Sequence, residues 1–342
     1  MKTILVTGGT GYLGSYTAVE LLNRGFEVIL ADNLSNSRAE VVGAIENITG
    51  KRPEFCCFDL CDMEKVNDFF SSHHIDAIIH FAAYKAVGES VEQPLKYYRN
   101  NLLSLLNLLE ICTRKKLGNF LFSSSCSVYG HCEKLPITED SPLPKAESPY
   151  GNTKQISEEI LEDTAKVNPW LNVVALRYFN PAGAHESGLI GEYPLSPPNN
   201  LVPVITQAAA GKRNSLTVYG KDYPTPDGTC IRDYIHVVDI AKAHVVALER
   251  LLQQKNKKNY EVFNLGTGKG NTVLEAIHVF EKVTGTKINV EIGRRREGDV
   301  EKVWADTTLA NKELGWKSEY SLEDIMRSAW KWEQKLGERI IS

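Results

Sequence analysis

A glycine-rich turn near the amino terminus limits what this chain can fold into more than any other feature. An apolar stretch over residues 3–7 is followed by Gly8-Gly9-Thr10-Gly11-Tyr12-Leu13-Gly14, and an amphipathic pattern then runs to Gly25. Glycine permits a tight turn between a strand and a helix. It also lets the backbone N–H groups at a helix amino terminus reach a pyrophosphate. The spacing G-x-x-G-x-x-G therefore predicts a dinucleotide-binding strand–turn–helix unit, with a ligand-free glycine turn as the alternative for the motif by itself.

An acidic residue stands where the second strand-like run ends. The carboxylate of Asp32 is placed to accept hydrogen bonds from an adenosine ribose, and it repels a 2′-phosphate. This favours NAD over NADP, although the cation of the nearby Arg38 would suit the extra phosphate. Asp59, after the third run, is either an adenine contact or a turn residue.

The first half of the chain alternates strand-like with helix-like segments. Helical patterns are clearest at residues 95–116 and 150–167, and the strand-like runs cover residues 3–7, 27–31, 54–58, 77–82, 119–123 and 173–178. Strands that are apolar throughout are typical of a parallel sheet buried on both faces. We therefore expect an α/β fold with a doubly wound Rossmann-type parallel sheet.

The composition of the sequence changes after Tyr178, where loops rich in proline and asparagine separate shorter elements. This predicts a smaller α/β substrate-binding lobe over the carboxyl edge of the sheet. We expect residues 1–180 to form the dinucleotide-binding domain and residues 181–342 the lobe. Part of residues 233–270, with a strand-like run at 261–265, is expected to return to the large sheet.

Ser125, Tyr150 and Lys154 form the candidate catalytic unit. Tyr150 and Lys154 are four residues apart in a helical pattern, and therefore on one face of the helix. To act as a base near neutral pH, a tyrosine must lower its pKa from ~10 by roughly 3 units, or about 4 kcal/mol. A neighbouring ammonium and a positively charged nicotinamide would both favour the phenolate, while Ser125 would hold a substrate hydroxyl in line. A surface helix with a chance Tyr–Lys pair is the alternative, which the glycine turn disfavours.

Composition excludes several other classes of function. The chain has 342 residues, 24% of them charged, and a net charge of −4, which argues against a nucleic-acid partner. Strand-like residues begin at Thr3, and apolar runs are shorter than the ~20 residues of a membrane span, so we expect a cytosolic protein with no membrane partner. Its seven cysteines suit buried thiols in a reducing compartment. His73 and His74 are too isolated from other ligand types in the sequence to predict a metal.

Eight blocks of sequence resemble the extended short-chain dehydrogenase/reductase family, and within it most closely the UDP-sugar 4-epimerases. The resemblance runs along the whole chain. The blocks are GGTGYLGS at 8–15, DNLSNS at 32–37, HFAAYKAVGES at 80–90, FSSS at 122–125, SPYG at 148–151, RYFNP at 177–181, GTCIRDYIHV at 228–237 and RREGD at 295–299. Each block alone is moderately specific, and together they are highly specific.

The resemblance implies a tightly bound NAD that is recycled rather than consumed. Tyr150 would take the proton from the sugar 4-hydroxyl while hydride passes from C4 to NAD. The 4-keto sugar would then turn about its diphosphate link and receive the hydride on its other face. This would interconvert UDP-glucose and UDP-galactose, with the nucleotide held firmly and the sugar loosely.

The resemblance also implies two sets of contact residues. The expected cofactor contacts are Gly8, Gly11, Tyr12, Leu13, Gly14, Asp32, Asn33, Asn36, Ser37, Asp59, Leu60, Phe81, Ala82, Lys85, Asn100, Tyr150, Lys154 and Tyr178. The expected substrate contacts are Ser125, Tyr150, Phe179, Asn180, Asn200, Leu201, Arg232, Arg296, Asp299 and Val303. In the second set, the two arginines offer planar donors to diphosphate oxygens, and Asp299 offers an acceptor to ribose hydroxyls.

Val303 stands where some of these epimerases carry a bulky tyrosine beside the sugar. A small residue there leaves room for a 2-acetamido group, so acceptance of UDP-GlcNAc and UDP-GalNAc is one hypothesis. Simple packing of Val303 is the other.

Three other functions are alternatives on the same fold: a dehydratase, a decarboxylase and a non-catalytic regulator. Related dehydratases carry an Asp-Glu pair after the active-site hydroxyl, whereas Cys126 and Ser127 follow Ser125 here. No residue points to the C5 carboxylate that a decarboxylase must stabilise. A non-catalytic NAD-binding regulator would have lost the tyrosine or the lysine, and both are present.

The helices expected at 95–116 and 150–167 carry broad apolar faces, with six leucines between positions 102 and 109. An apolar face wider than one core stripe suits an interface between subunits. Relatives pair through the equivalent helices, so we expect a homodimer.

Overall fold

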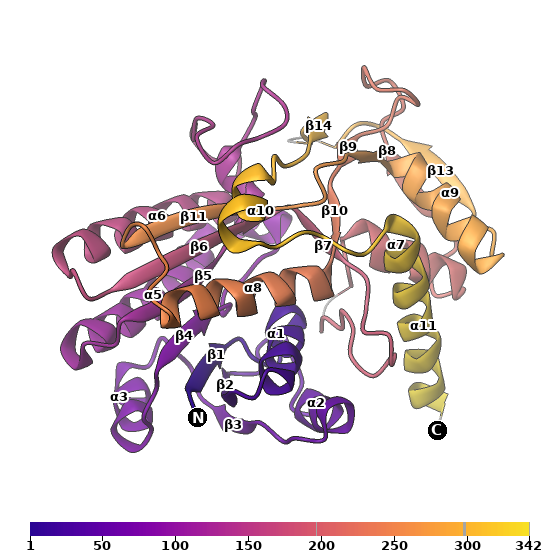
Figure 1. Ribbon diagram of the computed structural model, residues 1–342. Helices are drawn as coiled ribbons and strands as arrows, with labels where there is room; N and C mark the ends of the chain where they lie inside the picture. Colours follow the sequence, from indigo (N-terminus) through magenta and orange to yellow (C-terminus); the bar gives the residue numbers. More distant parts are fainter. Residues whose placement is uncertain (196, 297–298, 342) are drawn as a thin grey trace.

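A seven-stranded parallel sheet forms the centre of the larger lobe in the computed structural model, which describes residues 1–195, 197–296 and 299–341 (Figure 1). The strand order is β11-β6-β5-β4-β1-β2-β3. The strands are β1 (Thr3–Thr7), β2 (Glu27–Asp32), β3 (Glu54–Cys57), β4 (Ala77–His80), β5 (Asn119–Ser125), β6 (Asn172–Tyr178) and β11 (Tyr260–Leu265). All six pairings within the sheet are parallel.

Helices cover the sheet on both faces, because alternate residues of each buried strand point to opposite sides. Ile4 and Val6 of β1 pack in one core with α1 (Tyr12–Asn23), α2 (Val41–Thr49) and α8 (Val237–Leu252). Leu5 packs in the other core with α3 (Met63–Ser72), α5 (Pro94–Lys115) and α6 (Pro149–Val167). The expected doubly wound fold is confirmed.

The later part of the chain forms a second group of elements above the carboxyl ends of the strands (Figure 1). Its core is built mainly from four elements, which are α7 (Leu201–Ala209), β8 (Leu216–Tyr219), α9 (Val273–Thr284) and α11 (Leu322–Ile341). The remaining elements are α4 (Val87–Glu92), the 3-10 helix η1 (Cys126–Tyr129), β7 (Asn180–Ala182), β9 (Ile231–Arg232), β10 (Tyr234–His236), β12 (Asn271–Thr272), β13 (Val290–Gly293), β14 (Lys302–Val303) and α10 (Thr308–Leu314).

The chain returns from this second group to the large sheet. Strand β11 pairs with β6 from Tyr260 opposite Val173 to Leu265 opposite Tyr178, and α8 packs against α1. The strand expected at 261–265 therefore joins the large sheet as predicted, whereas the domain boundaries at residue 180 stay a prediction. Among the helices of the described residues, none has the length and apolarity to cross a membrane.

Candidate active site

A cavity of about 410 Å³ opens where the carboxyl ends of the parallel strands meet the second group of elements. Parallel α/β sheets bind ligands at this edge. Every residue expected to contact the cofactor lines this cavity, and so do Ser125, Phe179, Asn180 and Asn200 from the expected substrate set. Cofactor and substrate residues far apart in sequence thus share one cavity, although their contact roles stay predictions.

The glycine turn between β1 and α1 leaves no room for a side chain at Gly8 or Gly14. Gly8 has φ +66°, and a Cβ there would lie 2.8 Å from the backbone nitrogen of Ala82. A Cβ on Gly14 would lie 2.2 Å from the carbonyl oxygen of Gly8. The N-cap of α1 is Gly11, which provides no side-chain cap, and the first turn contains no acidic residue. The helix amino terminus therefore presents unpaired N–H groups and a positive dipole end to the cavity, which fits an anionic dinucleotide.

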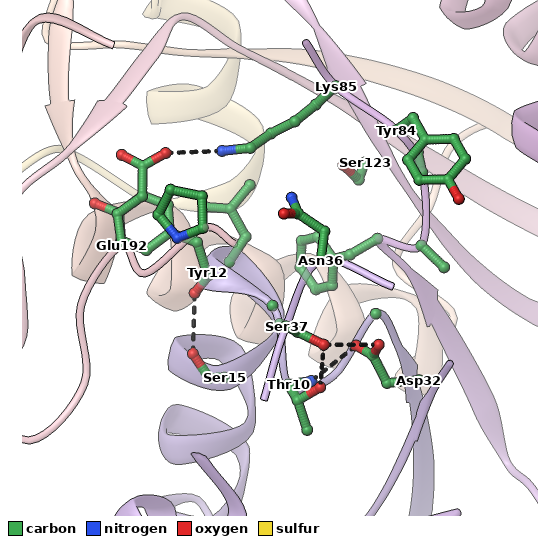
Figure 2. Close-up of a pocket in the computed structure, with 18 of the residues that line it drawn as sticks. Thr10, Tyr12, Ser15, Asp32, Asn36, Ser37, Tyr84, Lys85, Ser123 and Glu192 are labelled. Carbon is green, nitrogen blue, oxygen red and sulfur yellow. Dashed lines mark hydrogen bonds and ion pairs between the residues drawn. The ribbon is translucent and has the colours of Figure 1, made fainter. Parts of the chain in front are cut away.

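Asp32 is fixed at the end of β2 by its neighbours (Figure 2). Its carboxylate accepts hydrogen bonds from the backbone N–H of Thr10 (3.2 Å), the backbone N–H of Leu34 (2.9 Å) and Ser37 Oγ (2.9 Å). The carboxylate thus keeps one orientation along the cavity wall, as contact with ribose hydroxyls requires. The Arg38 guanidinium also lines the cavity and lies 4.2 Å from the ring centre of Tyr193.

The start of α6 places the tyrosine and lysine of the catalytic unit. Ser148 caps the helix by accepting a hydrogen bond from the Gly151 backbone N–H at 3.1 Å, and Pro149 occupies the first turn, where a missing N–H costs nothing. Lys154 donates from Nζ to the Ser123 carbonyl oxygen at 2.6 Å, and Nζ lies 6.0 Å from the ring centre of Tyr150. The unit expected from the sequence is therefore assembled at the cavity wall.

Burial shifts the pKa values of Tyr150 and Lys154 in the directions opposite to those that favour a phenolate beside an ammonium. It raises the pKa of Tyr150 to about 12, against the lowering effect of the Ser125 hydroxyl. It lowers the pKa of Lys154 to about 7, against the raising effect of the Glu158 carboxylate. Each shift disfavours the charged form, as desolvation does. The protein groups by themselves therefore do not lower the pKa of Tyr150, as a base near neutral pH requires. The expected lowering also depended on the positive charge of a bound nicotinamide.

The remaining expected substrate residues gather beside the cavity rather than in its wall. Arg232 and Val303 are partners in the β9–β14 pairing, and the Asp299 carboxylate lies 2.6 Å from Arg296 Nη2 and 3.6 Å from Arg232 Nη2. Val303 packs in a small cluster with the two cavity-lining residues Cys126 and Phe179. Arg232, Arg296, Asp299 and Val303 therefore form a group beside the cavity, and Val303 connects this group to the cavity wall through the apolar cluster. Leu201 is the first residue of α7, next to the cavity-lining Asn200, and residues 297–298 of the RREGD block lie outside the described residues.

Two acidic residues of the site were missed by the sequence analysis. The Glu192 carboxylate accepts a hydrogen bond from Lys85 Nζ at 2.9 Å (Figure 2). It also accepts one from Asn200 Nδ2 at 2.8 Å, and so joins an expected cofactor contact to an expected substrate contact. Glu192 lies in an irregular loop, where no sequence pattern singles it out. Glu158 follows Lys154 by four residues on α6, so helical spacing would have found it.

The structure also brings other ligand types to His73. Its ring lies near the side chains of Glu54 and Cys56, with the three ligand atoms within 4.8 Å of one another. The isolation of His73 in the sequence was therefore misleading, because the β3–α3 connection folds these residues together. The Glu54 carboxylate lies 3.0 Å from His73 Nε2, and an ordinary ion pair accounts for this arrangement.

Comparison with known proteins agrees with this geometry along the whole chain. The UDP-glucose 4-epimerase of Bacillus subtilis is 50% identical over 330 residues, which are 96% of each chain. The UDP-glucose 4-epimerase of Bifidobacterium longum, solved in complex with NAD+ and UDP, is 46% identical, with a TM-score of 0.93 over 98% of both chains. The enzyme of Stenotrophomonas maltophila, solved with NAD and formylated UDP-arabinopyranose, is 44% identical, with a TM-score of 0.96 over 99% of this chain and 100% of that one.

The chain belongs to the UDP-glucose 4-epimerase family.

A family of extended short-chain dehydrogenases, described as GDP-mannose 4,6 dehydratase, matches residues 5–329. Ser125 is followed in η1 by Cys126 and Ser127 rather than by the acidic pair of a dehydratase. Neither side chain supplies a carboxyl group for elimination. The site therefore agrees with the 4-epimerase family and not with the dehydratase activity after which the matching family is described.

Proposed function

We propose that this protein interconverts UDP-glucose and UDP-galactose by reversible, NAD-dependent oxidation at sugar C4 through a 4-keto intermediate. The observation that carries the proposal is the convergence of the tyrosine–lysine pair of α6 and the open amino terminus of α1 on one cavity. Membership of the 4-epimerase family over nearly the whole chain supports it.

In the proposed mechanism, three side chains have separate roles at the sugar 4-hydroxyl. NAD, when bound, would supply the hydride acceptor and donor for C4. Tyr150 accepts the proton of the 4-hydroxyl and returns it after the sugar has turned, and Ser125 holds that hydroxyl in line. Lys154 faces the Tyr150 ring and, when charged, stabilises the phenolate.

The nucleotide would be held by the residues beside the cavity. We assign the diphosphate to Arg232 and Arg296, the ribose to Asp299, and further UDP contacts to Asn180, Asn200 and Leu201. The paired Asp299 carboxylate keeps the two guanidinium groups close together, which suits two adjacent phosphates. Firm binding at UDP leaves the sugar, near Phe179, free to present either face.

Incubation of the purified protein with UDP-galactose, followed by separation of the products, tests the proposal. We expect UDP-glucose to accumulate to a fixed equilibrium ratio without net release of NADH. Net NADH release would instead identify a dehydrogenase, and a 4-keto-6-deoxy product would identify a dehydratase.

We also propose that the sugar pocket accepts UDP-N-acetylhexosamines. The half-buried Val303 packs against the cluster that contains Phe179, and its side chain is smaller than the tyrosine that some 4-epimerases carry there. Turnover of UDP-GlcNAc, compared with that of Val303→Tyr, tests this. Turnover of UDP-galactose but not UDP-GlcNAc by the unchanged protein would rule the extension out.

We propose that the protein is a homodimer that pairs through α5 and α6. These helices pack on each other, and α5 leaves large apolar side chains exposed, with Leu95 at 80%, Leu103 at 38% and Leu106 at 40% exposure. Two copies that met here would bury these leucines in a four-helix arrangement.

We further propose a cytoplasmic location. All seven cysteines are free thiols, as is usual in a reducing compartment. Fractionation of the cells that make the protein tests this.

A further inference from the structure

A buried ion pair lies behind the proposed catalytic residues, and the mechanism above does not use it. Glu158 and Arg177 are 5% and 4% exposed. The Arg177 guanidinium donates from Nε to both carboxylate oxygens of Glu158, at 2.9 and 3.2 Å, and from Nη2 to one of them at 2.5 Å. Such a forked contact fixes both side chains. It also provides the pairing that a buried carboxylate requires.

Sheet register places this ion pair one residue behind the site. Ser124 of β5 is opposite Arg177 of β6, and the next pair along is Ser125 opposite Tyr178. Ser124 Oγ donates to the Glu158 carboxylate at 2.5 Å. Glu158 therefore ties α6 to the two strands whose last residues are Ser125 and Tyr178.

Glu158 is also one helical turn from Lys154, on the same face of α6. The Lys154 ammonium donates to the Ser123 carbonyl oxygen and lies 4.7 Å from the centre of the Phe122 ring. Neither partner carries a net charge. Of the influences on Lys154, burial lowers its pKa and the Glu158 carboxylate raises it.

Arg177 on β6 is charged and paired with Glu158, whereas the nearby tyrosines and His80 are uncharged at neutral pH. Burial raises the pKa of Tyr150 on α6 to about 12 and also raises that of Tyr178 on β6. His80, at the end of β4, has its pKa lowered to about 3 by burial and by the Lys154 charge. Glu158 is thus the anion that acts on Lys154.

We propose that Glu158 is a positioning residue that keeps Lys154 charged and beside Tyr150, with Arg177 holding the Glu158 carboxylate in place. This deepens the proposed function and rests on it, because a charged Lys154 matters when Tyr150 exchanges a proton with a sugar hydroxyl. Without the carboxylate, burial acts alone and a larger fraction of Lys154 is neutral at pH 7. A neutral amine no longer favours the phenolate.

A direct titration of Lys154 tests this. In the purified protein with its cofactor bound and with ¹³C at the lysine Cε atoms, NMR follows the Lys154 signal with pH, and Lys154→Arg assigns it. Glu158→Gln is expected to lower the Lys154 midpoint by about one unit or more. Glu159→Gln removes the same charge from the adjacent, exposed position and is expected to leave the midpoint unchanged. The alkaline limb of the rate–pH profile for UDP-galactose should move to lower pH in Glu158→Gln only.

An unchanged Lys154 midpoint in Glu158→Gln would overturn the inference. Glu158→Gln leaves the Arg177 guanidinium buried without its carboxylate. If that variant does not fold, Glu158→Gln/Arg177→Met removes both charges. A smaller fall of the midpoint is then expected, because loss of the Arg177 cation acts in the opposite direction. A wild-type protein that does not convert UDP-galactose would contradict the proposed function. The titration is independent of that result, because it measures directly whether Glu158 sets the charge of Lys154.

Discussion

Tyr150 and Lys154 are affected in opposite directions by the same physical cause. Desolvation disfavours the phenolate of the first and the ammonium of the second, so the pKa of Tyr150 rises and that of Lys154 falls. Proton transfer needs both charged forms, and only nearby charges compensate for the lost water. The four-residue spacing predicted that the pair shares a helix face, but it contained no information about burial, which comes from strands elsewhere in the chain.

Tyr150→Phe is expected to lower the rate of UDP-galactose conversion by about 10²–10⁴-fold, because it removes the proton-transfer group and keeps the ring. Product separation at saturating substrate measures this. Tyr98→Phe is the control, since Tyr98 lies outside the cavity lining and its hydroxyl accepts a hydrogen bond from Asn152. Conversion by Tyr150→Phe at the wild-type rate would remove Tyr150 from the mechanism.

His80 makes folding stability depend on pH. It is buried, Thr7 Oγ1 lies 2.8 Å from its Nδ1, and its pKa is about 3, below the ~6.5 of an unfolded chain. Between these values the unfolded state binds a proton that the folded state does not, so the His80 contribution is present above pH ~6.5 and decreases as the pH falls.

His80→Asn retains a polar group near the Nδ1 position and removes the titration. The stability difference between wild type and variant should shrink below pH ~6.5 by up to about 1.4 kcal/mol per pH unit. Urea unfolding at pH 7.5, 6 and 5 measures it. A difference that is constant over this range would show that His80 does not titrate as inferred.

At the scale of elements, the β1–α1 turn depends on close backbone approach. The turn and the first residues of α1 pack without room for a side chain, since a Cβ on Gly14 would meet the Gly8 carbonyl at 2.2 Å. The glycine spacing in the sequence predicted this turn because its geometry involves residues only a few positions apart. The close approach of Gly8 to Ala82, which follows β4, could not be predicted in this way, because it depends on the pairing of β1 with β4 in the sheet.

Gly14→Ala is expected to destabilise the protein by about 1–3 kcal/mol and to weaken dinucleotide binding, because the helix must shift away from the turn. Gly43→Ala in α2 is the matched control. A Cβ there meets no atom within 4 Å among the described residues, and alanine favours a helix by about 1 kcal/mol. Urea unfolding and the content of bound NAD measure both effects. Equal behaviour of the two variants would contradict the role of the turn.

At the scale of the whole molecule, the exposed leucines of α5 are the test of assembly. Leu103→Glu/Leu106→Glu is expected to yield a monomer, because four charges would face one another across a paired interface. Light scattering at micromolar concentration measures the mass. Leu309→Glu alters a comparably exposed leucine on α10 and should leave the mass unchanged. A wild-type monomer would refute the proposed dimer.

The strands of the large sheet and the helices α1, α5 and α6 could be predicted to within a few residues, and every residue expected to contact the cofactor lines the cavity. β4, for example, ends at His80 rather than two residues later. The placement of Glu192 and the cluster around His73 could not be predicted. Each joins segments far apart in the chain through an irregular loop or a strand edge, where no periodic pattern marks the residues.

The sequence by itself determined the alternation of strands and helices, the glycine turn and the shared helix face of Tyr150 and Lys154. These depend on neighbours within one or two turns of chain, and their spacing is visible in the letters. Tertiary structure alone decided how deeply Lys154 is buried, which anion faces it, and that Arg232, Arg296 and Asp299 meet. Desolvation and long-range charge pairing depend on every element packed around a group, and no local pattern records them.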